Sequence, residues 1–383
     1  MPHPVFIMTS LGPIFADDLA RVKPGDRLRL TISAQTSDAA ALAQAALEAR
    51  ARGERVLVVC ADPADVPRLA QEMPWFEPKL DVRPLPDWET LPYDVLSPQE
   101  ELVSERLEAL YRLTAPTGGA DVLLTSAVTA SQRLSPVSYI GANTFFFHQG
   151  EQISLTTLQK RLAAAGYANV KQVLAAGEFA VRGSIVDVFP MGSERPFRLD
   201  FFDDEIESIR WFDVDTQRSM ESAEEIRLLP GHEFPVDPEA LLAFRQRWRR
   251  EFAGDPKKSI VYCDIEKEIL PPGIEYYLPL FFDETAALTD YLPPNARVFL
   301  LGDIEAALQA FGRDMASRYK VFAADPQRPA LAPERIWLKP EEFFKSLANF
   351  ARFTVEKKEN AEDLKRLSGI EVDRKSQNPV GKL

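Results

Sequence analysis

Over the first 140 positions, short apolar runs alternate with amphipathic segments. The apolar runs predict strands at residues 28–32, 55–60, 81–85 and 122–125. Between them, apolar positions at helical spacing predict helices at residues 38–52, 62–73 and 100–113. Strands that alternate with helices usually form a parallel sheet covered by helices. The first part of the chain is therefore predicted to be an α/β domain.

The pattern changes near residue 140. An aromatic run at 144–148 predicts a strand, and residues 154–165 predict a helix capped by Ser154. Residues 177–210 then alternate polar and apolar positions in runs broken by Gly183 and by 191–193, which is typical of antiparallel hairpins. After residue 230 the helical spacing returns at 237–250 and 304–319, with a strand-like run at 298–301. The middle is thus an α+β insert.

These changes predict the domain organisation. Residues 144–230 form an inserted domain between residues 25–143 and residues 231–350. Residues 1–24 are expected to be irregular. Residues 351–383 are expected to be a charged linker or the start of a further domain, because they are rich in charge and poor in aromatic residues.

The hairpins contain candidate contact residues. Arg182 precedes Gly183, and Arg198 shares a strand face with Asp200 because the two are two positions apart. Phe201 and Phe202 must face opposite sides of the sheet, so one is core and the other needs a partner or a cover. Arginine and exposed aromatic residues are typical interface anchors. The alternative is that the arginines pair within the sheet with Glu178, Asp187 or Asp200.

Composition limits the possible functions. The net charge of −13 argues against nucleic-acid binding by this chain alone. Cys60 and Cys263 are far apart, which is typical of reduced thiols in a cytoplasmic protein, and Cys60 ends an apolar run and should be buried. No apolar run is long enough for a membrane span, so no membrane contact is expected. The three histidines are too scattered for a metal site.

A phosphate loop would be expected after the first strand. Such a loop needs glycines for close approach of the backbone, and a lysine with Ser or Thr for phosphate and metal. This turn has neither Gly nor Lys, and its acid would repel phosphate at the helix N-terminus. We therefore expect no cofactor here, and a helix capped by Ser37 or Asp38 instead. The turn consists of Ser33, Ala34, Gln35, Thr36, Ser37 and Asp38.

Two further runs could be functional sites, but a purely structural interpretation is favoured for each. The acidic run 203–205 could bind a metal, but a solvated turn between strands is favoured. The aromatic run 145–147 could stack on bases, but a half-buried strand is favoured because no basic residues interleave with it. We find no catalytic constellation of Ser, His, Asp or Cys, and expect this chain not to be an enzyme.

Several blocks together resemble the N-terminal part of the bacterial transcription-repair coupling factors. The similarity extends over nearly all of residues 25–350, with a looser likeness to the excinuclease protein UvrB. The blocks are Asp87–Asp94, Ser97–Pro98, Ser104–Tyr111, Gly166–Tyr167, Gly177–Pro190, Phe197–Ile206, Leu229–Pro230, His232–Pro235 and Gly273–Phe282.

The resemblance implies that residues 25–143 and 231–350 are one degenerate P-loop, helicase-like sheet domain, split in sequence by a domain that docks the excinuclease protein UvrA. The positions that match this contact are Arg182, Arg198 and Phe202. It also implies that ATP and Mg, RNA polymerase and DNA are bound by domains outside this chain. The aromatic hairpin with which UvrB clamps damaged DNA has no counterpart, since only residues 87–99 fill its place.

The resemblance implies a recruitment module that brings in UvrA when the full protein displaces stalled RNA polymerase. Two alternatives remain. One is a regulatory clamp that folds back on the C-terminal motor domains, and the other is a fragment of an ATP-dependent helicase or nuclease. For the docking site we expect solvent-facing arginines whose replacement leaves the fold intact.

Overall fold

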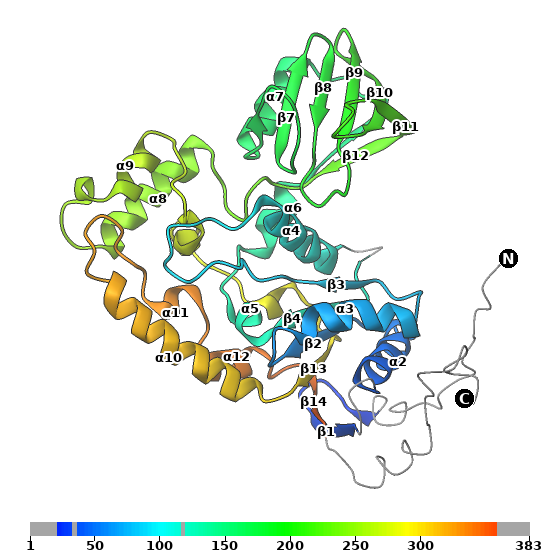
Figure 1. Ribbon diagram of the computed structural model, residues 1–383, viewed down its shortest axis with the longest axis vertical. Coiled ribbons are helices and arrows are strands. Elements are labelled where there is room, and N and C mark those ends of the chain that lie inside the picture. Colours follow the sequence, from blue (N-terminus) through cyan, green and yellow to red (C-terminus); the bar gives the residue numbers. More distant parts are fainter. Residues whose placement is uncertain (1–20, 33–36, 116–118, 358–383) are drawn as a thin grey trace, which may run out of the picture.

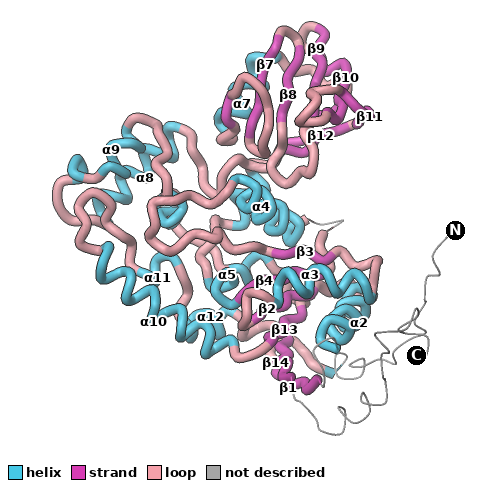
Figure 2. Tube along the Cα trace, viewed as in Figure 1, coloured by secondary structure: helices cyan, strands magenta, loops and turns pink. Residues whose placement is uncertain are grey.

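The computed structural model describes residues 21–32, 37–115 and 119–357. Its strands gather in two separate regions, and most helices surround the larger one (Figures 1 and 2). The mixed α/β class predicted from the alternation is confirmed, with one parallel sheet and separate sheets built from antiparallel strands.

The larger region is built on a six-stranded sheet in which every neighbouring pair is parallel. Its order is β1-β14-β13-β2-β4-β3, so the strands come from both sides of the insert. Parallel sheets are buried on both faces, and all residues of the central strands β2, β4 and β13 are indeed buried. The strands are β1 (Arg27–Ile32), β2 (Val56–Cys60), β3 (Val82–Pro84), β4 (Val122–Ser126), β13 (Arg297–Leu301) and β14 (Ala351–Lys357).

Helices cover both faces because successive strand residues point to opposite sides. Val58 and the predicted buried Cys60 pack with α2 and α3 on one face. Figure 1 shows these two helices on the same side of the sheet. Leu57 and Val59 pack with α4, α5, α10 and α12 on the other. The helices are α2 (Ser37–Ala51), α3 (Asp65–Phe76), α4 (Glu100–Thr114), α5 (Ala127–Ser131), α6 (Val137–Ala142), α10 (Ile304–Phe322), α11 (Pro333–Ile336) and α12 (Pro340–Ser346).

Strand β14 differs from the sequence prediction, which ended the folded domain at residue 350. It lies between β1 and β13 and pairs with both. Ala351, Phe353 and Val355 are buried at alternate positions, and Phe353 stacks on Phe299 with ring centroids 4.7 Å apart. A period of two was present in the sequence. It was obscured because Arg352, Glu356 and Lys357 resemble the charged residues that follow.

The insert is built on a second six-stranded sheet in the order β11-β10-β9-β8-β7-β6, with β5 and β12 paired beside it. Helix α7 begins after Ser154, whose hydroxyl accepts a hydrogen bond from the Thr157 amide, as predicted for its cap. The elements are β5 (Phe145–His148), α7 (Leu155–Ala164), β6 (Ala168–Asn169), β7 (Glu178–Arg182), β8 (Ile185–Val188), β9 (Phe197–Phe202), β10 (Glu205–Phe212), β11 (Ser219–Ala223) and β12 (Glu225–Leu228).

Helix α4 connects the insert to the parallel sheet. Its Glu108 accepts from Arg227 of β12 and from Arg112, and Arg227 also lies over the ring of Tyr111 at 4.5 Å. The amide of Gly192 donates to the Ser104 hydroxyl at 2.7 Å. One continuous apolar core runs through both regions. The insert is therefore packed on α4 and not only tethered to it.

A third, aromatic-rich core lies beyond the insert. It is formed by helices after residue 236 together with Trp88 and Tyr93 from the loop between β3 and α4. Helix α8 is capped by Asp237, which accepts from the amides of Glu239 and Ala240. The elements here are α8 (Pro238–Glu251), η1 (Pro256–Lys258), α9 (Ile260–Glu266), η2 (Ile274–Leu280) and η3 (Leu288–Tyr291).

Glu275 of η2 is expected to make stability depend on pH. Burial raises its pKa from 4.5 to about 7, although a hydrogen bond from Ser97 opposes the shift. A raised folded-state pKa favours folding at low pH, and this contribution is lost as pH rises through about 7. Glu275→Gln should therefore be more stable than wild type by about 2 kcal/mol at pH 8, with the difference shrinking as pH falls and vanishing only below the unfolded-state pKa of 4.5. Urea unfolding across this range checks it, and a difference that does not change with pH would contradict it.

Candidate partner-binding face of the second sheet

Two tight hairpins bring Arg182 and Phe202 to the same edge of the second sheet. Gly183 and Ser184 connect β7 to β8, and Gly183 has a φ of 63°. Asp203 and Asp204 connect β9 to β10, and Asp203 has a φ of 52°. Strands β7 and β9 both run antiparallel to β8, so their last residues lie at the same edge.

The alternation along β9 decides which phenylalanine is core. Phe201 is only 5% exposed and packs with the other inward residues, whereas Phe202 is 68% exposed. Arg198, Asp200 and Phe202 therefore share the outer face of β9. A large aromatic side chain left in water on a sheet face is typical of a contact site.

One buried carboxylate holds both arginines. Asp187 of β8 is fully buried, and its partners across the sheet include Arg198 of β9. Arg198 binds it with two hydrogen bonds, Nε–Oδ1 at 2.6 Å and Nη2–Oδ2 at 2.9 Å, and Arg182 adds Nη2–Oδ2 at 2.5 Å. Of the pairings left open by the sequence, the one with Asp187 is observed for both arginines.

The two arginines differ in exposure. The Arg182 side chain is 48% exposed and the Arg198 side chain only 14%, so the expectation that Arg198 faces solvent is wrong. Arg198 lies over the ring of Phe212 at 5.1 Å and donates to the Gln217 carbonyl at 3.2 Å. Sequence reasoning missed Gln217, because it lies in an irregular turn and its φ of 57° has no signal in the sequence.

Arg198→Ala is consequently expected to lower the free energy of unfolding by about 2 kcal/mol, because it leaves Asp187 buried with one arginine fewer. Arg182→Ala should cost less than about 1 kcal/mol, since half of its side chain is in water and Arg198 still neutralises Asp187. Urea denaturation of both variants distinguishes the two roles. Equal stability of Arg198→Ala and wild type would contradict this account.

The region predicted to resemble a phosphate loop is described only in part. Ser33, Ala34, Gln35 and Thr36 lie outside the described residues. Helix α2 begins at Ser37, so Ser37 and Asp38 belong to its first turn. Asp38 is fully buried and receives Arg68 of α3 in two hydrogen bonds, at 2.7 and 3.1 Å. The Asp38 carboxylate thus already occupies the N-terminal end of α2, where a bound phosphate would lie.

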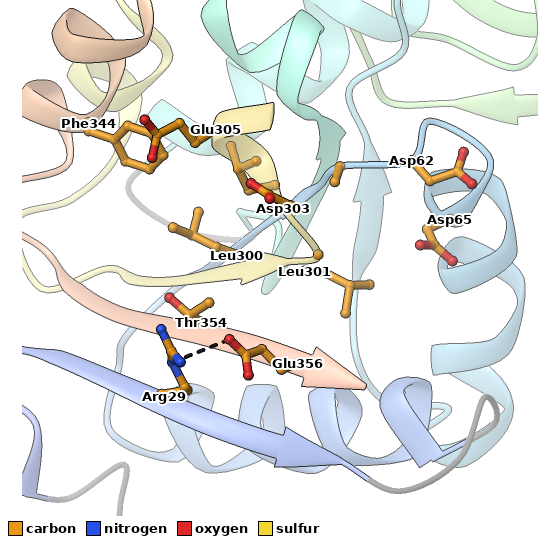
Figure 3. A pocket seen from close by; sticks show the side chains of 13 residues that line it. Arg29, Asp62, Asp65, Leu300, Leu301, Asp303, Glu305, Phe344, Thr354 and Glu356 are labelled. Atoms are coloured by element: carbon orange, nitrogen blue, oxygen red, sulfur yellow. Dashed lines mark ion pairs between the residues drawn. The ribbon is translucent and has the colours of Figure 1, made fainter. Parts of the chain in front are cut away.

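A cavity of about 690 Å³ opens at the carboxyl ends of the parallel strands, where α/β sheets usually bind ligands (Figure 3). Its single basic side chain among the described residues is Arg29, which pairs with Glu356 at 3.3 Å. The other charged residues of the lining are Asp62, Asp65, Asp303 and Glu305. Such a lining repels phosphate groups.

The predicted exposed turn at residues 203–205 and the predicted half-buried strand at residues 145–147 are both observed. Residues 203–205 are exposed at the β9–β10 turn, and within 145–147 only Phe147 is buried. The part of the chain that the structure describes has no group of three or more potential metal ligands. It also has no helix that is both long and apolar enough to cross a membrane.

The comparisons with known proteins agree with this arrangement. A family model described as the UvrB interaction domain matches residues 145–234, which span every strand of the insert. The transcription-repair-coupling factor of Escherichia coli (strain K12) is 42% identical over 298 residues, which are 78% of this chain and 26% of that protein. The predicted resemblance to the transcription-repair-coupling factors is confirmed.

Other transcription-repair-coupling factors match in the same way. The Haemophilus influenzae protein is 41% identical over 313 residues, covering 79% of this chain and 27% of the relative. The Bacillus subtilis protein is 32% identical over 216 residues, which are 52% of this chain and 18% of the relative. The chain thus spans about a quarter of the length of the first two of these curated relatives. Arg182, Arg198 and Phe202 all lie within the region that matches the interaction domain.

Proposed function

We propose that this chain is the recruitment module of a transcription-repair coupling factor and that its insert docks the excinuclease protein UvrA. The observation that carries the proposal is Phe202, which is 68% exposed at the same edge of the sheet as the half-exposed Arg182, within the region matched by the interaction domain. An aromatic ring and a planar guanidinium suit a partner surface with an apolar pocket and a carboxylate. Arg198 acts through Asp187 and positions Arg182.

In this proposal the full protein recognises RNA polymerase stalled at a DNA lesion and releases it by ATP-driven translocation, with both steps carried by domains outside this chain. The parallel sheet is then a helicase-like domain that no longer uses nucleotide. Isothermal titration of UvrA into this chain tests the docking step. Saturable binding at physiological salt is expected, and its absence would overturn the proposal.

We further propose that this chain does not bind ATP. The support is the Asp38–Arg68 pair at the start of α2 and the acidic lining of the cavity at the sheet edge. Titration of a fluorescent ATP analogue with Mg²⁺ should therefore show no saturable signal, because phosphate would meet carboxylates instead of backbone amides and a lysine. A dissociation constant in the micromolar range would contradict this prediction.

The same exposed ring also supports the clamp alternative, in which the insert contacts the C-terminal domains of the longer protein. One surface can serve both contacts in turn. The alternative predicts that the full-length protein binds UvrA more weakly than this chain does, since its face is then occupied. If the full-length protein and this chain bound UvrA with equal affinity, the clamp alternative would be contradicted and the recruitment proposal would stand.

A further inference from the structure

A second exposed apolar surface lies on the loop between β3 and α4, far in sequence from the insert. We name residues 87–97 the Leu91 loop. Within six positions it exposes three large aliphatic side chains: Leu91 at 59%, Val95 at 48% and Leu96 at 60%. Single exposed aliphatic residues are ordinary, but three on one short loop are typical of an interaction site.

The loop is anchored by two buried aromatic residues, one before its exposed aliphatic residues and one among them. Trp88 is 2% exposed and Tyr93 is 8% exposed, and both belong to the aromatic core. The amide of Asp94 donates to the Leu91 carbonyl at 2.9 Å, which closes a turn with Pro92 and Tyr93 at its centre. Tyr93 has a φ of 66°, a conformation that favours glycine.

The strained conformation of Tyr93 is held by packing. Its ring lies 6.1 to 6.3 Å from those of four aromatic neighbours, and their contacts offset the cost of the left-handed backbone. These neighbours are Tyr276, Tyr319, Phe322 and Trp337. Strain that is retained by its surroundings is frequent at functional sites.

Hydrogen bonds hold the loop in its middle and at its C-terminal end. Arg318 donates to the Pro92 carbonyl at 2.9 Å, and the hydroxyls of Thr90 and Tyr276 lie 2.7 Å apart. Ser97 accepts from the Gly273 amide at 3.0 Å and donates to the Glu275 carboxyl group at 2.8 Å. The exposed side chains are thus presented on a fixed backbone, which lowers the entropy lost on binding.

The charge around the loop selects the partner. Between Arg83 and Arg106 the chain has no Lys or Arg. Two arginines approach the loop from elsewhere, and each donates to a backbone carbonyl at 2.9 Å: Arg318 to Pro92, and Arg328, which lines a pocket with Asp94 and Val95, to Pro272. A groove of about 440 Å³ begins beside Glu89, with Val66, Leu85 and Leu102 in its lining. Such a surface repels nucleic acid and attracts cations. The acids of this segment are Asp87, Glu89, Asp94, Glu100, Glu101 and Glu105.

We propose that the Leu91 loop is a docking site for a basic and apolar polypeptide segment of a partner protein. The exposed leucines supply the apolar contact, and the surrounding carboxylates pair with Lys or Arg of the segment. The surface is separate from the Arg182–Phe202 face, so this proposal does not depend on the binding of UvrA.

The test uses the whole chain and a fluorescent amphipathic peptide of Leu and Lys, followed by anisotropy at physiological salt. Saturable binding is expected, weakened about tenfold in Leu91→Ser/Leu96→Ser, a loss of about 1.4 kcal/mol. The control is Trp75→Ser/Leu242→Ser, which removes two exposed apolar side chains elsewhere and should bind as wild type does. A Ser/Lys peptide and a Leu/Glu peptide should not bind, since each lacks one of the two required features.

Several outcomes would overturn the proposal. The first is equal binding by the loop variant, confirmed as folded by circular dichroism, and by wild type. The second is the absence of saturable binding of the Leu/Lys peptide. Self-association that depends on Leu91 and Leu96, seen by analytical ultracentrifugation, would make a second copy the occupant. If wild type bound duplex DNA and the loop variant did not, the occupant of the loop would be nucleic acid. Leu96→Ser alone serves as the milder variant if the double one fails to fold.

Discussion

Arg106→Met is expected to lower the free energy of unfolding by about 4 kcal/mol, because it leaves a buried carboxylate without its cation. Arg106 of α4 is fully buried, and Glu233, which follows the insert, is 3% exposed. Their Nε and Oε1 atoms lie 2.5 Å apart. Arg106 also donates to the Pro86 carbonyl at 2.6 Å and lies over the ring of Trp88 at 5.3 Å. It therefore ties together three segments of the chain.

Urea denaturation gives the size of the effect, and two further variants give its cause. Lys267→Met breaks an exposed pair with Asp264, 3.7 Å apart, and should cost less than about 1 kcal/mol. Arg106→Met/Glu233→Leu removes both charges and should recover much of the loss, since apolar residues can replace a buried ion pair. If Arg106→Met were as stable as Lys267→Met, the buried Arg106–Glu233 pair would contribute no more to stability than an exposed pair does.

Regular elements were predicted from the sequence because their cause is local. The spacing of apolar residues along α4, or the alternation along β9, is visible within a few positions. The ion pair between Arg106 and Glu233 is not local: its members are 127 residues apart and meet only in the folded chain. Arg106 stands at helical spacing with Leu102 and Leu110, but no pattern in the sequence indicates that Glu233 is its partner.

The candidate site shows the same limit. Three acids were possible partners of the arginines, and the strand register selects Asp187, which lies directly across from Arg198. Glu178 instead accepts from the amides of Leu174 and Ala175, and Asp200 accepts from Ser208. The exposure of Arg198 was predicted incorrectly for a related reason. The turn that contains Gln217 folds back over it, and turns of this kind leave no periodic signal.

Within this small network, some residues hold the sheet together and others are available to contact a partner. Arg198 and Asp187 are mostly buried and hold the sheet face, whereas Arg182 and Phe202 reach solvent at its edge. A partner that binds this face therefore meets a guanidinium already fixed by a carboxylate beneath it. Such preorganisation reduces the side-chain entropy lost on docking.

Phe202→Ala is expected to weaken binding of UvrA about thirtyfold, a loss of about 2 kcal/mol, if Phe202 is an aromatic anchor of the interface. The variant should be as stable as wild type, because the ring is 68% exposed and contributes little to the core. Arg182→Ala should weaken binding to a similar degree. Arg182→Glu should weaken it further, because it would place a carboxylate where the partner is expected to present one.

Isothermal titration calorimetry of UvrA with each variant measures these losses, and a urea melt of each variant shows that it is folded. Trp75→Ala is the matched control, since Trp75 is 73% exposed on α3, outside the insert, and its removal should leave the affinity unchanged. Arg198→Ala is expected to lose affinity and stability together, whereas Phe202→Ala and Arg182→Ala lose affinity alone. Folded Phe202→Ala and Arg182→Ala variants that bind like wild type would place the docking surface elsewhere on the chain.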